Sequence, residues 1–155
     1  MRPDWGINMD DLDMTLTRVI DATPAQIWNA WTNPAVLPLW FGPKGYSCQT
    51  KEIDLRTGGI WRFDMTGPDG KVWPNRHRFT LYTPMTRINF LLDDDSDEGE
   101  PIEVVVTLTP VAGGTQLVQT ITFPNAAAKA GAMAFGAEEL GYTTLDKLVS
   151  ILASA

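Results

Sequence analysis

The sequence predicts an α+β fold in which a curved, seven-stranded antiparallel sheet wraps around a long C-terminal helix, with two short helices after the first strand. Three observations predict it. Six segments rich in β-branched and apolar residues follow one another from residue 46 to residue 123, with a short turn motif between neighbours. An alanine-rich segment with an apolar stripe closes the chain. The 155 residues suit a single domain whose core needs no disulfide or metal to support it.

The N-terminal part contains the first strand and both short helices. Apolar and β-branched residues alternate over residues 13–20, which favours a strand. Thr23 can cap a helix, and Pro24 suits its first position. Asn33 precedes a proline, so we expect this helix to end there, and a second short helix to run to Trp40 and Phe41. We expect one domain over residues 1–155, with residues 1–11 as a loose acidic lead-in.

The middle of the chain reads as a run of hairpins. We expect strands at residues 46–55, 60–66, 72–82, 87–92, 102–109 and 116–123. Glycine, proline and aspartate mark the turns between them. Consecutive hairpins predict an antiparallel meander, and its apolar face needs a cover. From Asn125 onward we expect one long amphipathic helix to provide that cover. Three glycines, Gly131, Gly136 and Gly141, predict close approaches or bends in this helix.

Composition excludes several classes of function. Twelve basic and nineteen acidic residues give a net charge of −7, which argues against a nucleic-acid surface. A single cysteine excludes an intrachain disulfide, and a single histidine excludes histidine-rich metal centres. The first residues lack the apolar region of a signal peptide, and no apolar run is long enough to span a membrane. We therefore expect a cytoplasmic protein with no metal and no cofactor.

Two segments carry a resemblance to a known family. They are IDATPAQIWNAWTNPAVLPLWFGPKGYS, at residues 20–47, and IDLRTGGIWRFDMTGPDG, at residues 53–70. With the LDKL stretch of the final helix, they resemble the activator of heat-shock protein 90 ATPase homologue-like family. That family belongs to the START-like, or Bet v 1-like, helix-grip (SRPBCC) superfamily. The resemblance implies a hydrophobic cavity between the long helix and the concave sheet, used across the superfamily for lipids, polyketides and hormones.

Aromatic and apolar side chains are the candidate ligand-binding residues. On the strands and on the terminal helix such side chains can either line the cavity or pack in the core, and both interpretations stay open. Trp40 and Phe41, beside the GPKG turn, are candidate gate residues at the cavity mouth. The full candidate set is Trp40, Phe41, Trp61, Phe63, His77, Phe79, Phe90, Met133, Tyr142 and Leu145.

His77 is the only candidate for catalysis at neutral pH. Strand alternation places it on the same face as Phe79, so we expect it to point inward, with Arg76 and Arg78 solvated on the outer face. An inward imidazole could act as a general base or contact a polar ligand group. A hydrogen-bonded structural histidine is the alternative that we favour. A nucleophile–base pair of Cys48 with His77 finds no local support in the sequence.

Two charged motifs favour structural roles. Asp54 and Arg56 precede a glycine turn, and their pairing can order the hairpin. The run DDDSDEGE at residues 93–100 resembles the start of a calcium loop. However, Glu98 and Val104 stand where such a loop needs glycine and glutamate. We therefore expect a solvated hairpin loop.

The expected function is a soluble small-molecule binding module for an apolar or aromatic molecule or a lipid. The alternatives are a cavity enzyme of the cyclase, hydrolase or isomerase type and a chaperone-interacting stress-response module. Whether the protein is an enzyme stays open, and we favour the interpretation that it is not. A chain with a net charge of −7 offers little basic surface for binding a chaperone. The co-chaperones of the family carry an extra N-terminal domain, and we expect no room for one in this chain. The expected state is a monomer or homodimer.

Overall fold

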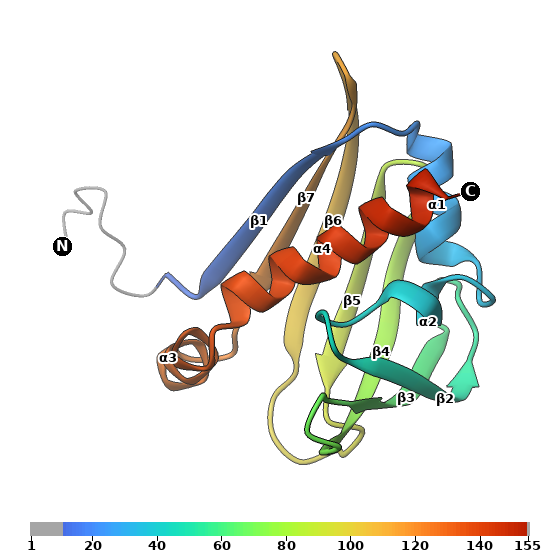
Figure 1. Cartoon of the computed structure of the whole chain (residues 1–155). Helices are drawn as coiled ribbons and strands as arrows, with labels where there is room; N and C mark the ends of the chain where they lie inside the picture. Colours follow the sequence, from blue (N-terminus) through green and yellow to red (C-terminus); the bar gives the residue numbers. More distant parts are fainter. Residues whose placement is uncertain (1–10, 155) are drawn as a thin grey trace, which may run out of the picture.

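A single antiparallel sheet forms the frame of the molecule. The computed structural model describes residues 11–154, so the predicted lead-in lies outside the described residues except for Asp11. The seven strands lie in the order β1-β7-β6-β5-β4-β3-β2, all antiparallel. Figure 1 shows the sheet curling around helix α4, with α1 and α2 at one end and α3 at the other. The predicted α+β helix-grip architecture is confirmed.

The strands follow the predicted meander. Their bounds are β1 Asp13–Ile20, β2 Ser47–Ile53, β3 Ile60–Thr66, β4 Val72–Thr83, β5 Arg87–Asp93, β6 Ile102–Val111 and β7 Gly114–Thr122. Strands β2 to β7 pair as successive hairpins, whereas β1 closes the order by pairing with β7. In that pairing Met14 lies opposite Ile121 and Leu16 opposite Gln119. The first and last strands therefore lie side by side, with β1 at the edge of the sheet.

The first helix begins as its sequence predicts. Helix α1, Pro24–Thr32, starts with a capping box in which the Thr23 hydroxyl accepts from the Gln26 amide and the Gln26 side chain accepts from the Thr23 amide. It buries Ile27, Ala30 and Trp31. Helix α2, Leu37–Trp40, is a single turn. These two helices close one end of the curved sheet (Figure 1).

The C-terminal segment forms two helices where the sequence predicts one. Helix α3, Ala126–Phe135, ends at Gly136, and α4, Ala137–Ala153, begins there. Gly136 adopts a φ of +90°, a left-handed conformation that only glycine adopts without strain and that interrupts the helix. A single helix from Asn125 onward is therefore wrong, whereas the bend predicted at the glycines is confirmed at Gly136, where α3 turns away from α4 (Figure 1).

Gly141 permits a close contact between α4 and strand β1. A Cβ atom at this position would lie 2.6 Å from Cδ1 of Leu16 on β1. The predicted close approach is therefore confirmed at Gly141. At Gly131 a Cβ atom would meet no atom within 4 Å, so the prediction is wrong there.

The core lies between the concave face, α1, α2 and the C-terminal half of α4. It contains Leu16, Trp31, Trp40, Trp61, Phe63, Phe79, Phe90, Leu117, Leu145 and Leu148, all nearly inaccessible to solvent. By contrast, α3 buries none of its residues. No helix among residues 11–154 is long and apolar enough to cross a membrane. The core thus fills one end of the sheet and leaves the end near α3 less filled.

Candidate functional site

An apolar pocket lies where the core stops, between the α3–α4 corner and the concave sheet. Its volume is about 360 Å³. Its walls come from β1, β3, β5, β6, β7, both C-terminal helices and the loop after α2. The lining residues are Met14, Leu16, Phe41, Gly42, Pro43, Met65, Phe90, Leu92, Ile102, Val104, Gln119, Ile121, Phe123, Ala132, Phe135, Ala137, Leu140, Gly141 and Thr144. Gln119 and Thr144 are the polar side chains in this wall.

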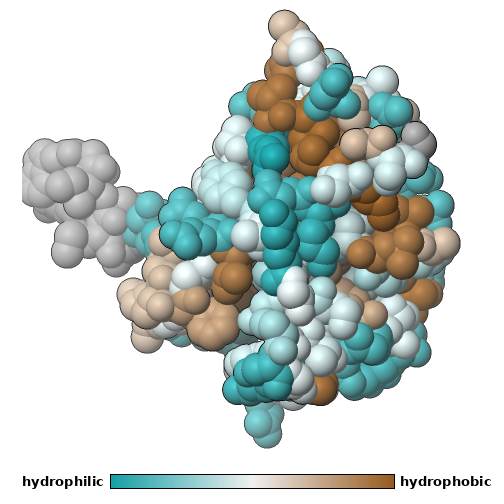
Figure 2. Space-filling model, in the orientation of Figure 1, coloured by the Kyte–Doolittle hydropathy of each residue, from teal (hydrophilic) through white to brown (hydrophobic). Residues whose placement is uncertain are grey.

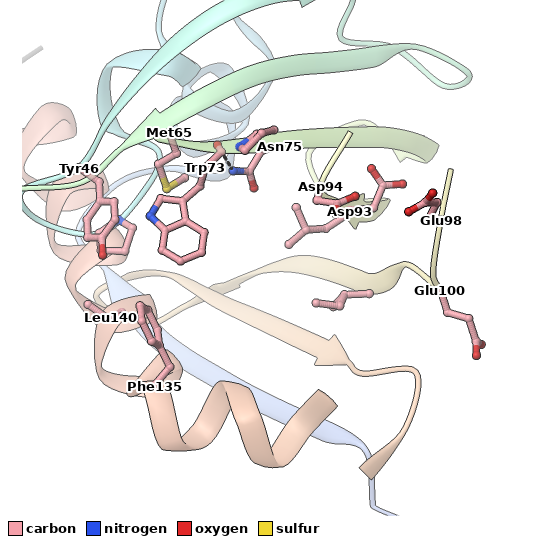
Figure 3. A pocket seen from close by; sticks show the side chains of 14 residues that line it. Tyr46, Met65, Trp73, Asn75, Asp93, Asp94, Glu98, Glu100, Phe135 and Leu140 are labelled. Atoms are coloured by element: carbon pink, nitrogen blue, oxygen red, sulfur yellow. Dashed lines mark hydrogen bonds between the residues drawn. The ribbon is translucent and has the colours of Figure 1, made fainter. Parts of the chain in front are cut away.

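A second hollow of about 460 Å³ continues the first toward solvent. The two share Pro43, Met65, Leu92, Ile102, Phe135 and Leu140, so we treat them as one pocket with an inner and an outer part. The outer part adds Tyr46, Trp73, Pro74, Asn75, Asp93, Asp94, Glu98 and Glu100. Figure 3 shows the aromatic side chains together at one end of the outer part and the carboxylates at the other.

Two exposed rings meet at the entrance. Phe135 on α3 and Trp73 on β4 are 61% and 37% exposed. Their ring centroids lie 6.2 Å apart in an edge-to-face arrangement. The surface over α3 is correspondingly apolar (Figure 2). Contact between these two rings therefore narrows the entrance between α3 and the sheet.

Helix α4 holds the loop that forms another wall of the pocket. The Lys147 ammonium donates to the carbonyl oxygens of Pro43 and Tyr46, at 3.4 and 3.1 Å. The Thr143 hydroxyl accepts from the backbone amide of Lys44, at 3.1 Å. Burial lowers the pKa of Lys147 from its usual value. These bonds fix the position of Phe41, Gly42 and Pro43 against the sheet.

Two of the ten predicted ligand-binding residues line this pocket. They are Phe41, beside the GPKG turn, and Phe90 on β5. The other candidates lie elsewhere. Trp61 and Phe63 stack on each other with centroids 3.8 Å apart and are fully buried. Phe79 packs beside Phe90, with centroids 5.6 Å apart. These aromatic residues of the strands thus pack in the core and do not line the pocket.

The remaining candidates on the helices also lie outside the pocket lining. Trp40 is buried, and its indole N–H donates to the Ala30 carbonyl at 3.0 Å, so it packs in the core. Leu145 is fully buried against the same core. The Tyr142 hydroxyl accepts from the Thr17 amide at 3.2 Å, which ties α4 to β1. Met133 is exposed on α3.

His77 points inward, as strand alternation predicts. It is 1% exposed, stacks on Phe90 with centroids 4.4 Å apart, and meets the edges of Phe41 and Trp61. The predicted hydrogen bond is missing at one nitrogen, since Nε2 has no partner among residues 11–154. Burial lowers the pKa of His77 to about 3, although Asp93 acts in the opposite direction. The imidazole is therefore neutral at physiological pH and lies behind the pocket wall.

Cys48 has the surroundings of a structural thiol. Its sulfur donates to the carbonyl oxygen of Phe41 at 3.3 Å. Burial raises the pKa of Cys48 to about 12, although the charge of Lys147 acts in the opposite direction. A thiol of such high pKa is protonated at neutral pH and is a poor nucleophile.

Both arginines beside His77 are ion-paired; the Arg76 side chain is largely buried, whereas the Arg78 side chain stays partly exposed, as predicted. Arg76 binds Asp93 through two hydrogen bonds of 2.9 and 2.7 Å, and Arg78 reaches the same carboxylate at 2.9 Å. Arg62 binds Asp95 in the same bidentate manner. The prediction of a solvated acidic loop is therefore wrong for Asp93, which strand register places opposite Arg76, and for Asp95, whose carboxylate binds Arg62 from beyond the end of β5. The predicted pair of Asp54 with Arg56 is present at 2.8 Å.

Sequence reasoning missed the residues that form the entrance. Trp73 lies two residues before Asn75 on the same face of the strand. Pro74 between them is unfavourable within a strand and weakened the strand pattern there. Phe135 immediately precedes the glycine that ends α3, and the expected continuous helix hid its position at a corner. Tyr46 directly follows the GPKG turn. For Phe135 and Tyr46, the available signal was an aromatic residue next to a glycine that ends a helix or a turn.

Comparison with known proteins identifies the family. The family model described as "Activator of Hsp90 ATPase homolog 1-like protein" (AHSA1) matches residues 21–153. The chain belongs to the AHSA1 family. No curated protein matches it.

Solved structures support this AHSA1 assignment. Protein Ms6760 from Mycobacterium smegmatis is 26% identical with a TM-score of 0.83, covering 93% of this chain and 92% of its own. Protein NE0264 from Nitrosomonas europaea is 25% identical with a TM-score of 0.82, covering 96% and 97%. A protein from Rhodobacter sphaeroides is 27% identical with a TM-score of 0.81, covering 93% and 94%. The chain thus has the START-like helix-grip fold of its family, which is the fold of a ligand-binding module.

Proposed function

We propose that this AHSA1 protein binds a small apolar or aromatic molecule, or a lipid chain, in the pocket between the α3–α4 corner and the sheet. The observation that carries the proposal is the composition of the inner part. Seventeen of its nineteen lining residues are apolar or glycine, with Gln119 and Thr144 as the polar exceptions. Such a wall favours apolar contents, with a few polar groups to orient them.

The polar exceptions differ in what they can offer a ligand. The Thr144 hydroxyl already donates to the Leu140 carbonyl at 3.3 Å. The Gln119 side chain is half-buried on β7 and faces the same wall. Its amide carries both donors and acceptors, so it suits a hydroxyl or carbonyl group of a bound molecule.

A catalytic role finds little support in the same geometry. His77 lies behind Phe41 and Phe90 rather than in the pocket lining. Its low pKa leaves it a very weak base, far from the value near the working pH that general-base catalysis favours. We therefore propose binding in place of turnover as the activity of the pocket.

Fluorescence of the neutral apolar dye N-phenyl-1-naphthylamine tests the proposal. The dye should bind the folded protein with saturable enhancement. Ala137→Phe should abolish this enhancement, because Ala137 lines the inner part and a phenyl ring would fill it. Ala134→Phe is the matched control, since Ala134 is exposed on α3 and lines neither part. Absence of binding, or equal binding by both variants, would contradict the proposal.

A further inference from the structure

We propose that the natural ligand is a cationic amphiphile, an apolar chain or ring that carries an ammonium group. This inference rests on the proposed function and adds the charge of the bound molecule. Its basis is the change in lining along one continuous pocket. The inner part is apolar, whereas the outer part ends at carboxylates of the β5–β6 loop.

The charged side chains that line the outer part are all acidic. Asp93, Asp94, Glu98 and Glu100 line it, and no lysine or arginine does so among the residues that the structure describes. Asp93 is neutralised by Arg76 and Arg78. In the described part of the chain Asp94, Glu98 and Glu100 have no basic partner within ion-pair distance. Three acidic residues therefore line the outer part without an ion-pair partner in the described part of the chain.

The aromatic end of the outer part also suits a cation-bearing ligand. Tyr46, Trp73 and Phe135 gather there, opposite the carboxylates (Figure 3). Aromatic faces attract ammonium groups through their quadrupole. Lys71 Nζ already covers one face of the Trp73 ring, 3.9 Å from its centroid, so Tyr46 and Phe135 are the rings left for a ligand ammonium. The walls thus accommodate an apolar body and a cationic group at once.

An anionic amphiphile such as a fatty acid fits this pocket poorly. With its chain in the inner part, its carboxylate would meet Asp94, Glu98 and Glu100 without a balancing basic residue in the lining. A like charge at such a site costs free energy. The same three carboxylates stabilise an ammonium group, by an amount that added salt reduces because they are exposed.

Three eight-carbon compounds, octylammonium, octanol and octanoate, provide the test. They share an apolar chain and differ in the charge of the head group. Each competes with N-phenyl-1-naphthylamine for the native protein. Octylammonium should displace the dye at a concentration about five-fold below octanol, the size expected for exposed ion pairs, and octanoate should be the weakest competitor. High salt should reduce these differences.

Two double variants distinguish the effect of the carboxylates in the pocket from the effect of the overall net charge on binding. Glu98→Gln with Glu100→Gln should remove most of the preference for octylammonium. Glu138→Gln with Glu139→Gln makes the same change in net charge at exposed residues outside the pocket lining, and should preserve it. Equal displacement by all three compounds, stronger displacement by octanoate, or equal effects of the two double variants would overturn this inference alone. Failure of the dye to bind would overturn the proposed function and this inference with it.

Discussion

His77 is the only histidine of the chain, and its ring is enclosed by aromatic side chains. Its Nε2 atom has no hydrogen-bond partner in the described residues. Alternation along β4 could predict that the side chain faces inward. It could not predict the missing partner, because the rings that surround His77 come from β3, β5 and the loop after α2.

The buried imidazole makes the free energy of unfolding depend on pH. Its pKa is about 3 in the folded protein and near 6.5 when exposed, so only the unfolded chain takes up a proton as the pH falls through 6.5. Stability should therefore fall by about 2 kcal/mol between pH 7 and pH 5. Urea unfolding at both pH values measures this. His77→Phe should remove the decrease, and an unchanged pH dependence in that variant would contradict the assignment to His77.

Asp93 and Asp94 are neighbours in sequence, but we expect only Asp93 to contribute strongly to the stability of the fold. Asp93 is 10% exposed at its side chain and binds Arg76, which is 13% exposed. Burial raises the pKa of Asp93, but hydrogen bonds from Arg76 and the Asp95 amide outweigh this and hold the pKa below its usual value. Its loss would leave Arg78 without its carboxylate partner, and Arg76 with only the exposed carboxylate of Asp97 and the carbonyl of Ser96. Asp94 is exposed and accepts one bond from the Ser96 amide.

Asp93→Asn should destabilise the protein by about 2–4 kcal/mol, whereas Asp94→Asn should cost less than about 0.5 kcal/mol. Urea unfolding at neutral pH compares the two variants. The carboxylate run in the sequence did not distinguish these residues. The distinction comes from the register of β4 and β5, which places Arg76 opposite Asp93. Equal stability of the two variants would contradict the role given to the Arg76 pair.

At the scale of elements, the break between α3 and α4 determines the shape of the pocket. Phe135 and Ala137 lie on either side of Gly136, and both line the inner part. A continuous helix would not form this corner. The sequence contained the signal, a glycine within an alanine-rich segment, but Gly131 and Gly141 gave the same signal and continue their helices. Propensity alone therefore could not identify which of the three glycines ends a helix.

Gly136 and Gly131 should respond in opposite ways to alanine. Gly136→Ala should destabilise by about 1–2 kcal/mol, since alanine is strained at a φ of +90° and no neighbour would clash with its Cβ. Gly131→Ala should stabilise by up to about 1 kcal/mol, because Gly131 lies within α3 and its Cβ would meet open space. Thermal unfolding of both variants measures this. A neutral Gly136→Ala would show that the break is not fixed by this residue.

At the scale of the whole molecule, the fold was far easier to predict than the site. Each hairpin is predicted locally, by a turn motif between two β-rich segments, whereas no local signal predicts that β1 pairs with β7. The division of aromatic residues between core and pocket has no such local signal. Trp61 and Phe90 lie on similar strands, yet only Phe90 reaches the pocket, because the curvature of the sheet and the α3–α4 corner decide where space remains.

The pocket exists only when the whole sheet is formed. Its inner walls come from five strands, from β1 to β7, and from both C-terminal helices. A molecule that binds there binds the folded state and not the unfolded chain, so it must raise the free energy of unfolding. Octylammonium at about 100 times its dissociation constant should add about 2.7 kcal/mol.

Urea unfolding with and without octylammonium measures this linkage, with Ala137→Phe as the variant that should show no gain. The comparison also separates true pocket binding from adsorption, since apolar dyes become fluorescent on loosely packed or partly unfolded chains as well. Adsorption to such states lowers stability or leaves it unchanged. If octylammonium displaces the dye but adds no stability, the dye is bound to a loosened form of the protein, and the support for a pocket ligand is removed.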